Sequence, residues 1–441
     1  MPATGRQRLS LALSLIAITA LVIWYANQVF PHVRDYTQGW NQAYLFPLMS
    51  PIGADFRAGV HFPGTLLAQG QDPYVGSGLW YPPFSALLFL PYQMVDPGLA
   101  FSIHVSLIVL LTIASVWCAI RITELMIPKR SSSQRTGDLG MTLPLFLSLT
   151  FLTVSSYGFV FGAERGNIDV YVLAFSLVGL WILVRSPNRV WLQVICFAVA
   201  AHLKVYPAVL FLLLIWKHGR RSLVPIVAVN AALLFCIGPG PALHFIQTLS
   251  RVAASPETGA ANHSAASFAQ MVNGFLDARG LPEIPSLVFL AVPVAIWSAS
   301  VWILLRRGYC GSGAVWLFAL SVPLMNLVPS TSHDYKLVLL SAPFSMLLVF
   351  LLEEYVATGR RLPLSQIAVA CALLFFLSVS YVALPPVLGN KYPFILGMQV
   401  LLAWRALASP AALPGAKGPG TGASLAPEAN GTPRYRTPTL D

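Results

Sequence analysis

Twelve long apolar runs dominate this chain and constrain its fold more than any other feature. A helix needs about 20 apolar residues to cross a bilayer, and only helices and closed barrels satisfy their backbone hydrogen bonds within lipid. The runs therefore predict an all-α polytopic membrane protein, a bundle of about 12 spans. They cover residues 9–30, 99–126, 141–162, 167–184, 190–203, 205–216, 222–240, 286–305, 314–329, 336–352, 364–384 and 393–407.

The composition excludes the soluble alternatives. Hydrophobic residues make up 56% of the 441 positions, and charged residues only 10%. An average soluble domain carries about 25% charged residues. So few charges cannot cover the surface of a water-soluble protein of this length, and the apolar content is too high for a disordered chain. An ordinary cytoplasmic enzyme is therefore excluded.

The charge distribution predicts the orientation in the membrane. The run 9–30 is too long for the apolar core of a signal peptide, which has about 7–15 residues. We therefore interpret it as a retained anchor with a cytoplasmic N-terminus. Alternating sides from there places 19 of the 27 Lys and Arg residues on the cytoplasmic side, as the positive-inside rule expects. The net charge of +11 then reflects orientation, and no nucleic-acid partner is needed. We expect a multi-pass plasma-membrane protein with both termini cytoplasmic.

Residues 1–408 form the predicted transmembrane domain, and two of its outer loops are long. In the first, 31–98, the apolar segment 79–95 contains three prolines and is too short to span, so we expect it to be interfacial or re-entrant. The second, 241–285, lacks a confident span. The tail 409–441, rich in Pro, Gly, Ala and Thr, is predicted to be a disordered cytoplasmic extension.

One acidic residue stands close to the outer membrane surface after the first helix. Asp55 lies in the segment 53–57, two residues before Arg57. A carboxylate here can act as a general base that takes the proton of an acceptor hydroxyl. The alternative is an exposed loop carboxylate, solvated or paired with Arg57.

A lysine lies at the break between two short apolar runs. Lys204 separates 190–203 from 205–216, which are either two spans or the arms of one broken hairpin. Ionisable residues in spans are costly and indicate function, and a lysine near a helix N-terminus can hold a lipid phosphate. The alternative is a side chain that extends to the membrane interface.

Three further segments place polar side chains on the same outer face. The turn 164–169 carries Arg165 and Asn167, which either cap helix ends or line a polar site. The segment 329–336 adds two more candidates, His333 and Lys336, although a lone histidine is more often structural. The aromatic pair Trp80 and Tyr81 suits either an interfacial anchor or a sugar platform.

Several common nucleotide and metal motifs are absent from the sequence. There is no Walker A loop, no Rossmann GxGxxG and no HExxH. The five cysteines form no CxxC pair, so neither a disulfide framework nor a metal cluster is indicated. The cytoplasmic loops are too short for a nucleotide-binding domain. Any donor substrate must therefore be reached through the membrane or from the outer face.

Together, these motifs resemble glycosyltransferase family 87, whose members are polyprenol-phosphate-mannose-dependent mannosyltransferases of the GT-C type. The resemblance extends over roughly residues 5–405. It rests on three N-terminal motifs in order, on two later turns and on the late segment: Asp55-Phe56, Gln71-Asp72-Pro73-Tyr74, Tyr81-Pro82-Pro83-Phe84, Gly166-Asn167, Lys204 with Pro207, and Pro329 to Lys336.

The resemblance implies a GT-C bundle with juxtamembrane helices in the first outer loop. It implies that a hexose, mannose in the family, moves with inversion from a polyprenyl-phosphate donor to an extracytoplasmic glycan or glycolipid. No metal and no cofactor besides this lipid-linked co-substrate are expected. The implied roles are the general base for Asp55, donor-phosphate binding for Lys204, His333, Arg165 and Lys336, and substrate contacts for Arg57, Tyr81 and Asn167.

One alternative function is a transporter or flippase of a lipid-linked saccharide. Broken helices on the outer side also suit a secondary transporter. Such proteins usually contain internal repeats, and the two halves of this chain show no clear self-similarity. A purely structural membrane protein would not explain a one-sided cluster of Asp, Lys and His.

Overall fold

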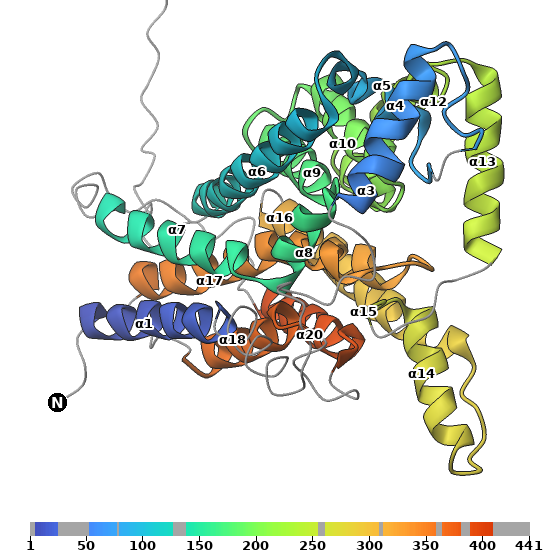
Figure 1. The fold of residues 1–441 in the computed structure, drawn as a ribbon. Coiled ribbons are helices and arrows are strands. Elements are labelled where there is room, and N and C mark those ends of the chain that lie inside the picture. Colours follow the sequence, from blue (N-terminus) through green and yellow to red (C-terminus); the bar gives the residue numbers. More distant parts are fainter. Residues whose placement is uncertain are drawn as a thin grey trace, which may run out of the picture. The chain divides into compact units, whose positions relative to one another are not determined.

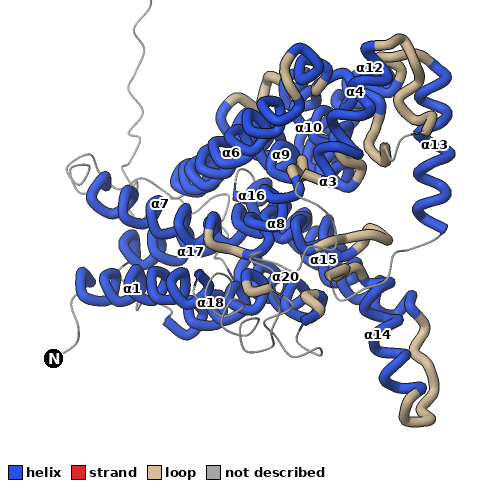
Figure 2. The backbone as a smooth tube through the Cα atoms, viewed as in Figure 1, coloured by secondary structure: helices blue, strands red, loops and turns tan. Residues whose placement is uncertain are grey.

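A computed structural model describes residues 5–24, 53–76, 79–126, 138–254, 261–307, 312–358, 364–380 and 389–408. Every regular element within these ranges is a helix, and the only strand-like pairing among them is an isolated bridge between Asn262 and His333. Figure 1 labels the helices, and Figure 2 shows helices joined by short connections throughout the same ranges. The all-α prediction is therefore confirmed for the described part of the chain.

Where the structure describes them, the twelve apolar runs lie largely within helices. The elements are α1 (Gly5–Trp24), α6 (Pro97–Met126), α7 (Asp138–Val154) with α8 (Tyr157–Arg165), α9 (Asp169–Arg185), α10 (Val190–Leu203), η5 (Tyr206–Leu210) with α11 (Phe211–His218), η6 (Gly219–Ser222) before α12 (Leu223–Leu234), α15 (Ser286–Arg306), α16 (Ser312–Leu327), η7 (Asp334–Leu340) with α17 (Ser341–Thr358), α18 (Leu364–Ser378) and α20 (Tyr392–Ala408).

Fewer helices than twelve are long enough to cross a bilayer unaided. Three described segments pass by length and hydropathy: Pro97–Met126, Ser286–Arg306 and Asp334–Leu352. Counting two bent pairs, Thr142–Val154 with Tyr157–Arg165 and Tyr206–Leu234 with Pro239–Val252, raises the number to five. The remaining apolar helices have 10–17 residues. Twelve spans and the finer GT-C arrangement stay predictions.

The two long outer loops contain helices of their own. The first carries α3 (Ala54–Phe56), η2 (Arg57–His61), α4 (Phe62–Ala68), α5 (Pro83–Leu88) and η3 (Leu90–Met94). The last two occupy the proline-containing segment 79–95, and neither is long enough to span, as the sequence predicts. The region 241–285 contains α14 (Ala265–Asp277) and most of α13 (Pro239–Ala254). The end of the first apolar run (25–30), residues 31–52 of the first loop and the tail 409–441 lie outside the described residues.

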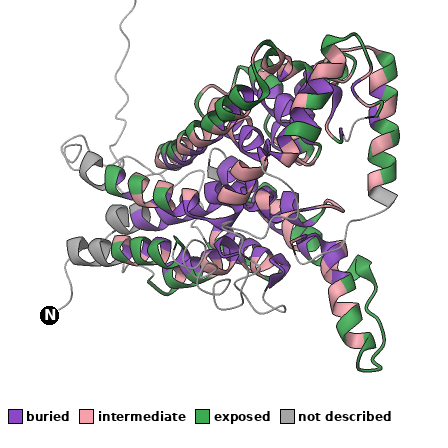
Figure 3. Cartoon of the chain, viewed as in Figure 1, coloured by how far each residue is buried: buried purple, intermediate pink, exposed green. Residues whose placement is uncertain are grey.

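Burial differs strongly between the apolar helices. The segment formed by η7 and the start of α17 is almost fully enclosed, and α17 packs on α6 and α16. Helix α15 is mostly exposed, with Leu287 70% and Trp302 58% accessible. In Figure 3, purple gathers where the helices meet in the middle of the view, and green is prominent on outlying helices such as α13. Exposed apolar side chains at this density suit a lipid-facing surface.

Candidate functional site

Two glycines bring Asp55 to the end of helix α8. Gly53 precedes α3 with φ 74°, and its N–H donates to the Glu164 carbonyl at 2.9 Å. Gly166 follows α8 with φ 67°, and a Cβ there would lie 2.7 Å from the Phe56 Cβ. Left-handed φ and the lack of a side chain are the two properties that only glycine combines without strain. The first outer loop and the turn after α8 therefore approach at backbone distance.

The Asp55 carboxylate is held by two side chains from that turn. Arg165 donates to Oδ1 through Nε at 2.9 Å and through Nη2 at 2.5 Å, and the Asn167 Nδ2 donates to Oδ2 at 2.7 Å. The Asp55 and Arg165 side chains are only 13% and 18% exposed. Asp55 is thus paired with Arg165 across the fold rather than with the nearby Arg57, whose side chain is exposed.

Lys204 lies at the same cluster because α10 ends one residue before it. Its backbone is extended, and the 3-10 helix η5 with Pro207 follows. Its Nζ donates to Asn167 Oδ1 at 2.9 Å and to Asp169 Oδ2 at 3.0 Å. Tyr206 donates a short hydrogen bond to the other oxygen of Asp169. Because Lys204 is 7% exposed and Asp169 is 1% exposed, the lysine is a buried, paired cation and does not extend to the interface.

Aromatic rings surround the Lys204 ammonium. Its Nζ lies 5.2 Å from the Tyr81 ring centre and 4.8 Å from that of Tyr335. Both distances fit cation–π attraction. Burial, with further contributions from the Asp55 and Asp169 carboxylates, raises the pKa of Tyr81 well above its usual value. Tyr81 therefore keeps its phenol proton and is a hydrogen-bond donor next to the lysine.

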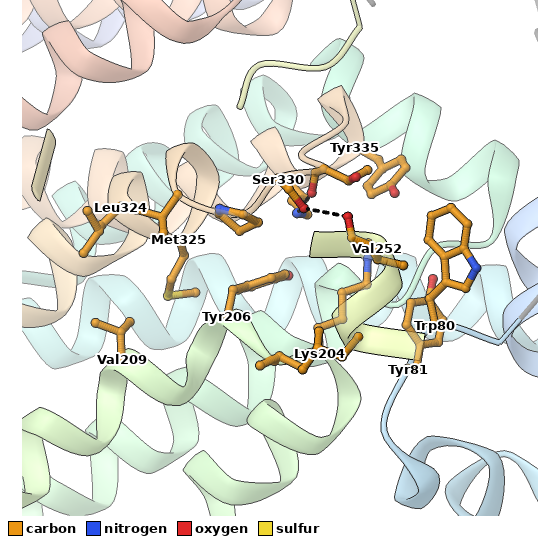
Figure 4. Close-up of a pocket in the computed structure, with 16 residues that line it drawn as sticks. Trp80, Tyr81, Lys204, Tyr206, Val209, Val252, Leu324, Met325, Ser330 and Tyr335 are labelled. Atoms are coloured by element: carbon orange, nitrogen blue, oxygen red, sulfur yellow. Dashed lines mark hydrogen bonds between the residues drawn. The ribbon is translucent and has the colours of Figure 1, made fainter. Parts of the chain in front are cut away.

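A cavity of about 470 Å³ opens beside this cluster. In Figure 4, Val209, Leu324 and Met325 lie at one end, and Trp80, Tyr81 and Tyr335 lie at the other, with Lys204 beside them. The full lining is Trp80, Tyr81, Lys204, Val205, Tyr206, Val209, Leu249, Val252, Leu324, Met325, Val328, Pro329, Ser330, Thr331, Tyr335 and Lys336. The cavity therefore has a long apolar part and a cationic, hydroxyl-rich end.

The second cationic residue of the cavity comes from the late outer turn. The Lys336 Nζ donates to the Thr331 carbonyl at 2.6 Å and lies 5.0 Å from the centre of the Tyr206 ring. Lys336 is 5% exposed. The late outer turn therefore supplies a second buried lysine to the cavity lining.

A buried polar contact fixes this turn. His263 Nδ1 lies 3.1 Å from Asp334 Oδ1, and its Nε2 lies 3.0 Å from the Ser332 hydroxyl. All three residues are 0% exposed, so this Ser-His-Asp arrangement is closed to substrates and holds two loops together. Burial, with the nearby charge of Lys336 contributing less, lowers the pKa of His263 well below its usual value.

The sequence-predicted residues separate into two groups. Asp55, Arg165, Asn167 and Lys204 form one hydrogen-bonded network, and Tyr81 and Lys336 line the cavity beside it. Within the network only Lys204 lines the cavity, and Asp55, Arg165 and Asn167 lie behind it. His333 and Arg57 belong neither to the network nor to the cavity lining. His333 forms the bridge with Asn262, and its ring lies 5.5 Å from that of Tyr335. The roles of all eight in substrate binding or catalysis stay predictions.

Three residues of the cluster were not predicted from sequence. Asp169 lies in the predicted turn 164–169, and Tyr206 follows Lys204 by two positions, so proximity to known candidates was the available signal. Tyr335 had the same signal next to Lys336. Whether the side chains of these residues enter the cluster depends on how the broken helices pack against each other.

Among the residues that the structure describes, no group of three or more His, Cys, Asp or Glu side chains is arranged to hold a metal ion. The prediction of a metal-free reaction is not tested by this observation and stays a prediction. The charged groups of the cluster are the carboxylates of Asp55 and Asp169, the buried lysines Lys204 and Lys336, and Arg165.

The long apolar helices and the exposed apolar side chains of the described residues are features of an integral membrane protein. A sequence model of glycosyltransferase family 87 matches residues 79–331, which is more than half of the chain. The chain therefore belongs to this family and is a membrane glycosyltransferase. Comparison with curated proteins finds no significant match. The matched region includes Tyr81, Arg165, Asn167 and Lys204, whereas Asp55 lies before it.

Proposed function

We propose that this glycosyltransferase moves a hexose, mannose in the first instance, from a polyprenyl-phosphate donor to an extracytoplasmic glycan or glycolipid. The reaction proceeds with inversion, and Asp55 is the general base. The observation that carries the proposal is the cavity itself, which joins an apolar part to a buried lysine that is hydrogen-bonded, through Asn167, to the Asp55 carboxylate.

The apolar part of the cavity suits the lipid of such a donor. It is lined by aliphatic and thioether side chains from η5, α13 and α16: Val205, Val209, Leu249, Val252, Leu324, Met325 and Val328. These groups give no directional contacts and bury apolar area, which stabilises an isoprenoid chain by about 25 cal/mol per Å². Several of these side chains are partly exposed, which supports entry of the lipid from the bilayer.

The charges near the cavity suit a monophosphate. Arg165, Lys204 and Lys336 supply three formal positive charges, and Asp55 and Asp169 supply two formal negative charges. Arg165 and Lys204 are paired with these two carboxylates, whereas the Lys336 ammonium donates to the Thr331 carbonyl and forms no ion pair among the described residues. Lys336 is therefore available to the phosphate between the sugar and the lipid.

The chemistry follows from these positions. Asp55 takes the proton of the acceptor hydroxyl as its oxygen forms a bond to C1 of the donor sugar. The bond from C1 to the phosphate oxygen breaks on the opposite face through an oxocarbenium-like transition state. Polyprenyl phosphate leaves with the electron pair, and Lys204 and Lys336 stabilise the growing charge on its oxygens. A phosphate leaving group then needs no strong general acid.

The donor is tested with purified full-length protein in detergent and an acceptor extract from the native membrane. We expect label to move from polyprenyl-phosphate-[³H]mannose to the acceptor and none to move from GDP-[³H]mannose. Direct use of the nucleotide sugar would contradict the proposal. Binding of the lipid donor without transfer, together with its movement across reconstituted vesicles, would favour the transporter alternative.

The position of Tyr81 gives a second test. A Cβ at Gly59 would lie 2.6 Å from the Tyr81 Cε2, so Gly59→Ala displaces a ring that lines the cavity and lies against Lys204. We expect kcat/KM for the donor to fall by about 10- to 100-fold, since misplacements of about 1 Å have such effects. Gly274→Ala, in helix α14 with nothing within 4 Å of the new Cβ, should match the wild type. Equal activity of both variants would show that Tyr81 does not shape the donor site.

A further inference from the structure

The side-chain amide of Asn167 lies between the proposed base and the phosphate-binding lysine. We infer that Asn167 is a positioning residue that fixes the Asp55 carboxylate relative to Lys204 and directs catalysis to one oxygen of Asp55, namely Oδ2. This inference rests on the proposed function. It assigns a role to a residue that the sequence suggests only as a substrate contact.

The hydrogen bonds determine the orientation of this amide. Its Oδ1 accepts from the Lys204 Nζ at 2.9 Å and from the Asp169 backbone N–H at 3.1 Å, and its Nδ2 donates to Asp55 Oδ2 at 2.7 Å. An ammonium and a backbone N–H can only donate, and a carboxylate can only accept. No other orientation satisfies all three bonds. Asn167 is also 2% exposed, so its polar atoms face protein groups.

The same bonds distinguish the two oxygens of Asp55. An ionised carboxylate offers about two lone-pair directions on each oxygen. Arg165 uses both directions on Oδ1 through Nε and Nη2. Asn167 uses one direction on Oδ2. The remaining acceptor position is therefore on Oδ2, and this atom receives the proton of the incoming hydroxyl.

Asn167→Asp tests this role with little structural change. An aspartate keeps the oxygen that accepts from Lys204 and from the Asp169 N–H, because its carboxylate has the same shape as the amide and offers an acceptor at the same place. It replaces the donor to Asp55 with a second carboxylate, which repels the Asp55 carboxylate and favours a protonated form of the pair. The other ionisable groups are Arg165, Tyr81 and Tyr335 near Asp55 and Lys204 and Asp169 beside residue 167, and none of them is changed by the substitution.

We expect sugar transfer by Asn167→Asp to fall at least tenfold near pH 7 and to recover as the pH rises. The acid limb of the pH profile of kcat/KM should move upward by about one pH unit or more, since adjacent carboxylates repel each other. The donor KM should change less than kcat, because the Lys204 contact is kept. Asn273→Asp, which adds the same charge on exposed helix α14, should keep the wild-type profile.

The outcomes separate this inference from the proposed function. A uniform loss of activity at every pH would show that Asn167 is merely structural and would overturn the inference. An unshifted profile with full activity would also overturn it. Loss of transfer in Asp55→Asn would still support the proposed mechanism in either case. If Asp55→Asn keeps full activity, the mechanism itself fails, whatever Asn167→Asp shows.

Discussion

Replacing Asp55 by asparagine should abolish sugar transfer while the protein stays folded. The substitution keeps the size of the side chain, and its amide oxygen can still accept from Arg165. It removes the carboxylate oxygen Oδ2, which accepts from Asn167 at 2.7 Å in the wild type. In the proposed mechanism, this oxygen takes the proton of the acceptor. General-base catalysis contributes about 10²–10⁴-fold. We therefore expect kcat to fall by about 10³-fold, with the donor affinity within a few-fold of the wild type.

The control for this variant comes from the same outer loop. The oxygens of Asp72 accept from the Tyr74 N–H at 2.9 Å and lie 2.7 Å from His244 Nδ1, and neither contact is to the Asp55 network. Asp72→Asn should therefore retain most of the activity. Initial rates with the lipid-linked donor and thermal unfolding of both variants in detergent provide the comparison. Rates for Asp55→Asn near those of Asp72→Asn would show that Asp55 is not the base.

Replacing Lys204 by glutamine should damage both folding and catalysis. The substitution leaves the Asp169 carboxylate, 1% exposed, without its cation. Breaking a buried ion pair by removing one partner costs about 3–5 kcal/mol, and the short bond from Tyr206 offsets only part of it. In the proposed mechanism, the same change also removes the positive charge that stabilises the donor phosphate. We expect a clear loss of thermal stability and a fall in kcat/KM of about 10²–10³-fold.

A double variant separates these two effects. Asp169→Asn in the Lys204→Gln background removes the uncompensated charge and should restore most of the stability. It should not restore transfer, because the phosphate still lacks the lysine. Thermal unfolding and donor KM, measured on the wild type, both single variants and the double variant, test this expectation. Recovery of activity together with stability would show that Lys204 serves the fold alone.

The helical organisation could be predicted because each helix within a membrane requires a run of apolar residues. Where the structure describes them, the twelve runs lie largely within helices, and the two helices of segment 79–95 are too short to span, as its length and its prolines predict. Helices α13 and α14 were not predicted, because their apolar residues lie on one face of a helix instead of forming a run. The length of an apolar run also does not show where a span bends. Helices α7 and α8, for example, form one apolar segment with a bend of 60° between them.

Most residues of the site could be predicted from the sequence, but the hydrogen bonds between them could not. Asp55 and Lys204 stand out because charges are rare and costly near a membrane. Their link through Asn167 depends on the left-handed turn at Gly166 and on the helix break at Lys204, which together join segments more than 100 residues apart. The pairing of Asp55 with Arg165 over Arg57 has the same origin. Such contacts follow from tertiary packing, and no local pattern encodes them.

In the proposed reaction, Asp55 and Lys204 support a single in-line displacement at C1 of a lipid-linked sugar. The most direct test is the anomeric configuration of the product, determined by NMR after transfer by the purified wild-type protein. We predict a linkage opposite in configuration to that of the donor, with release of one polyprenyl phosphate for each sugar transferred. A product that retains the donor configuration would require a covalent or double-displacement route and would contradict this mechanism.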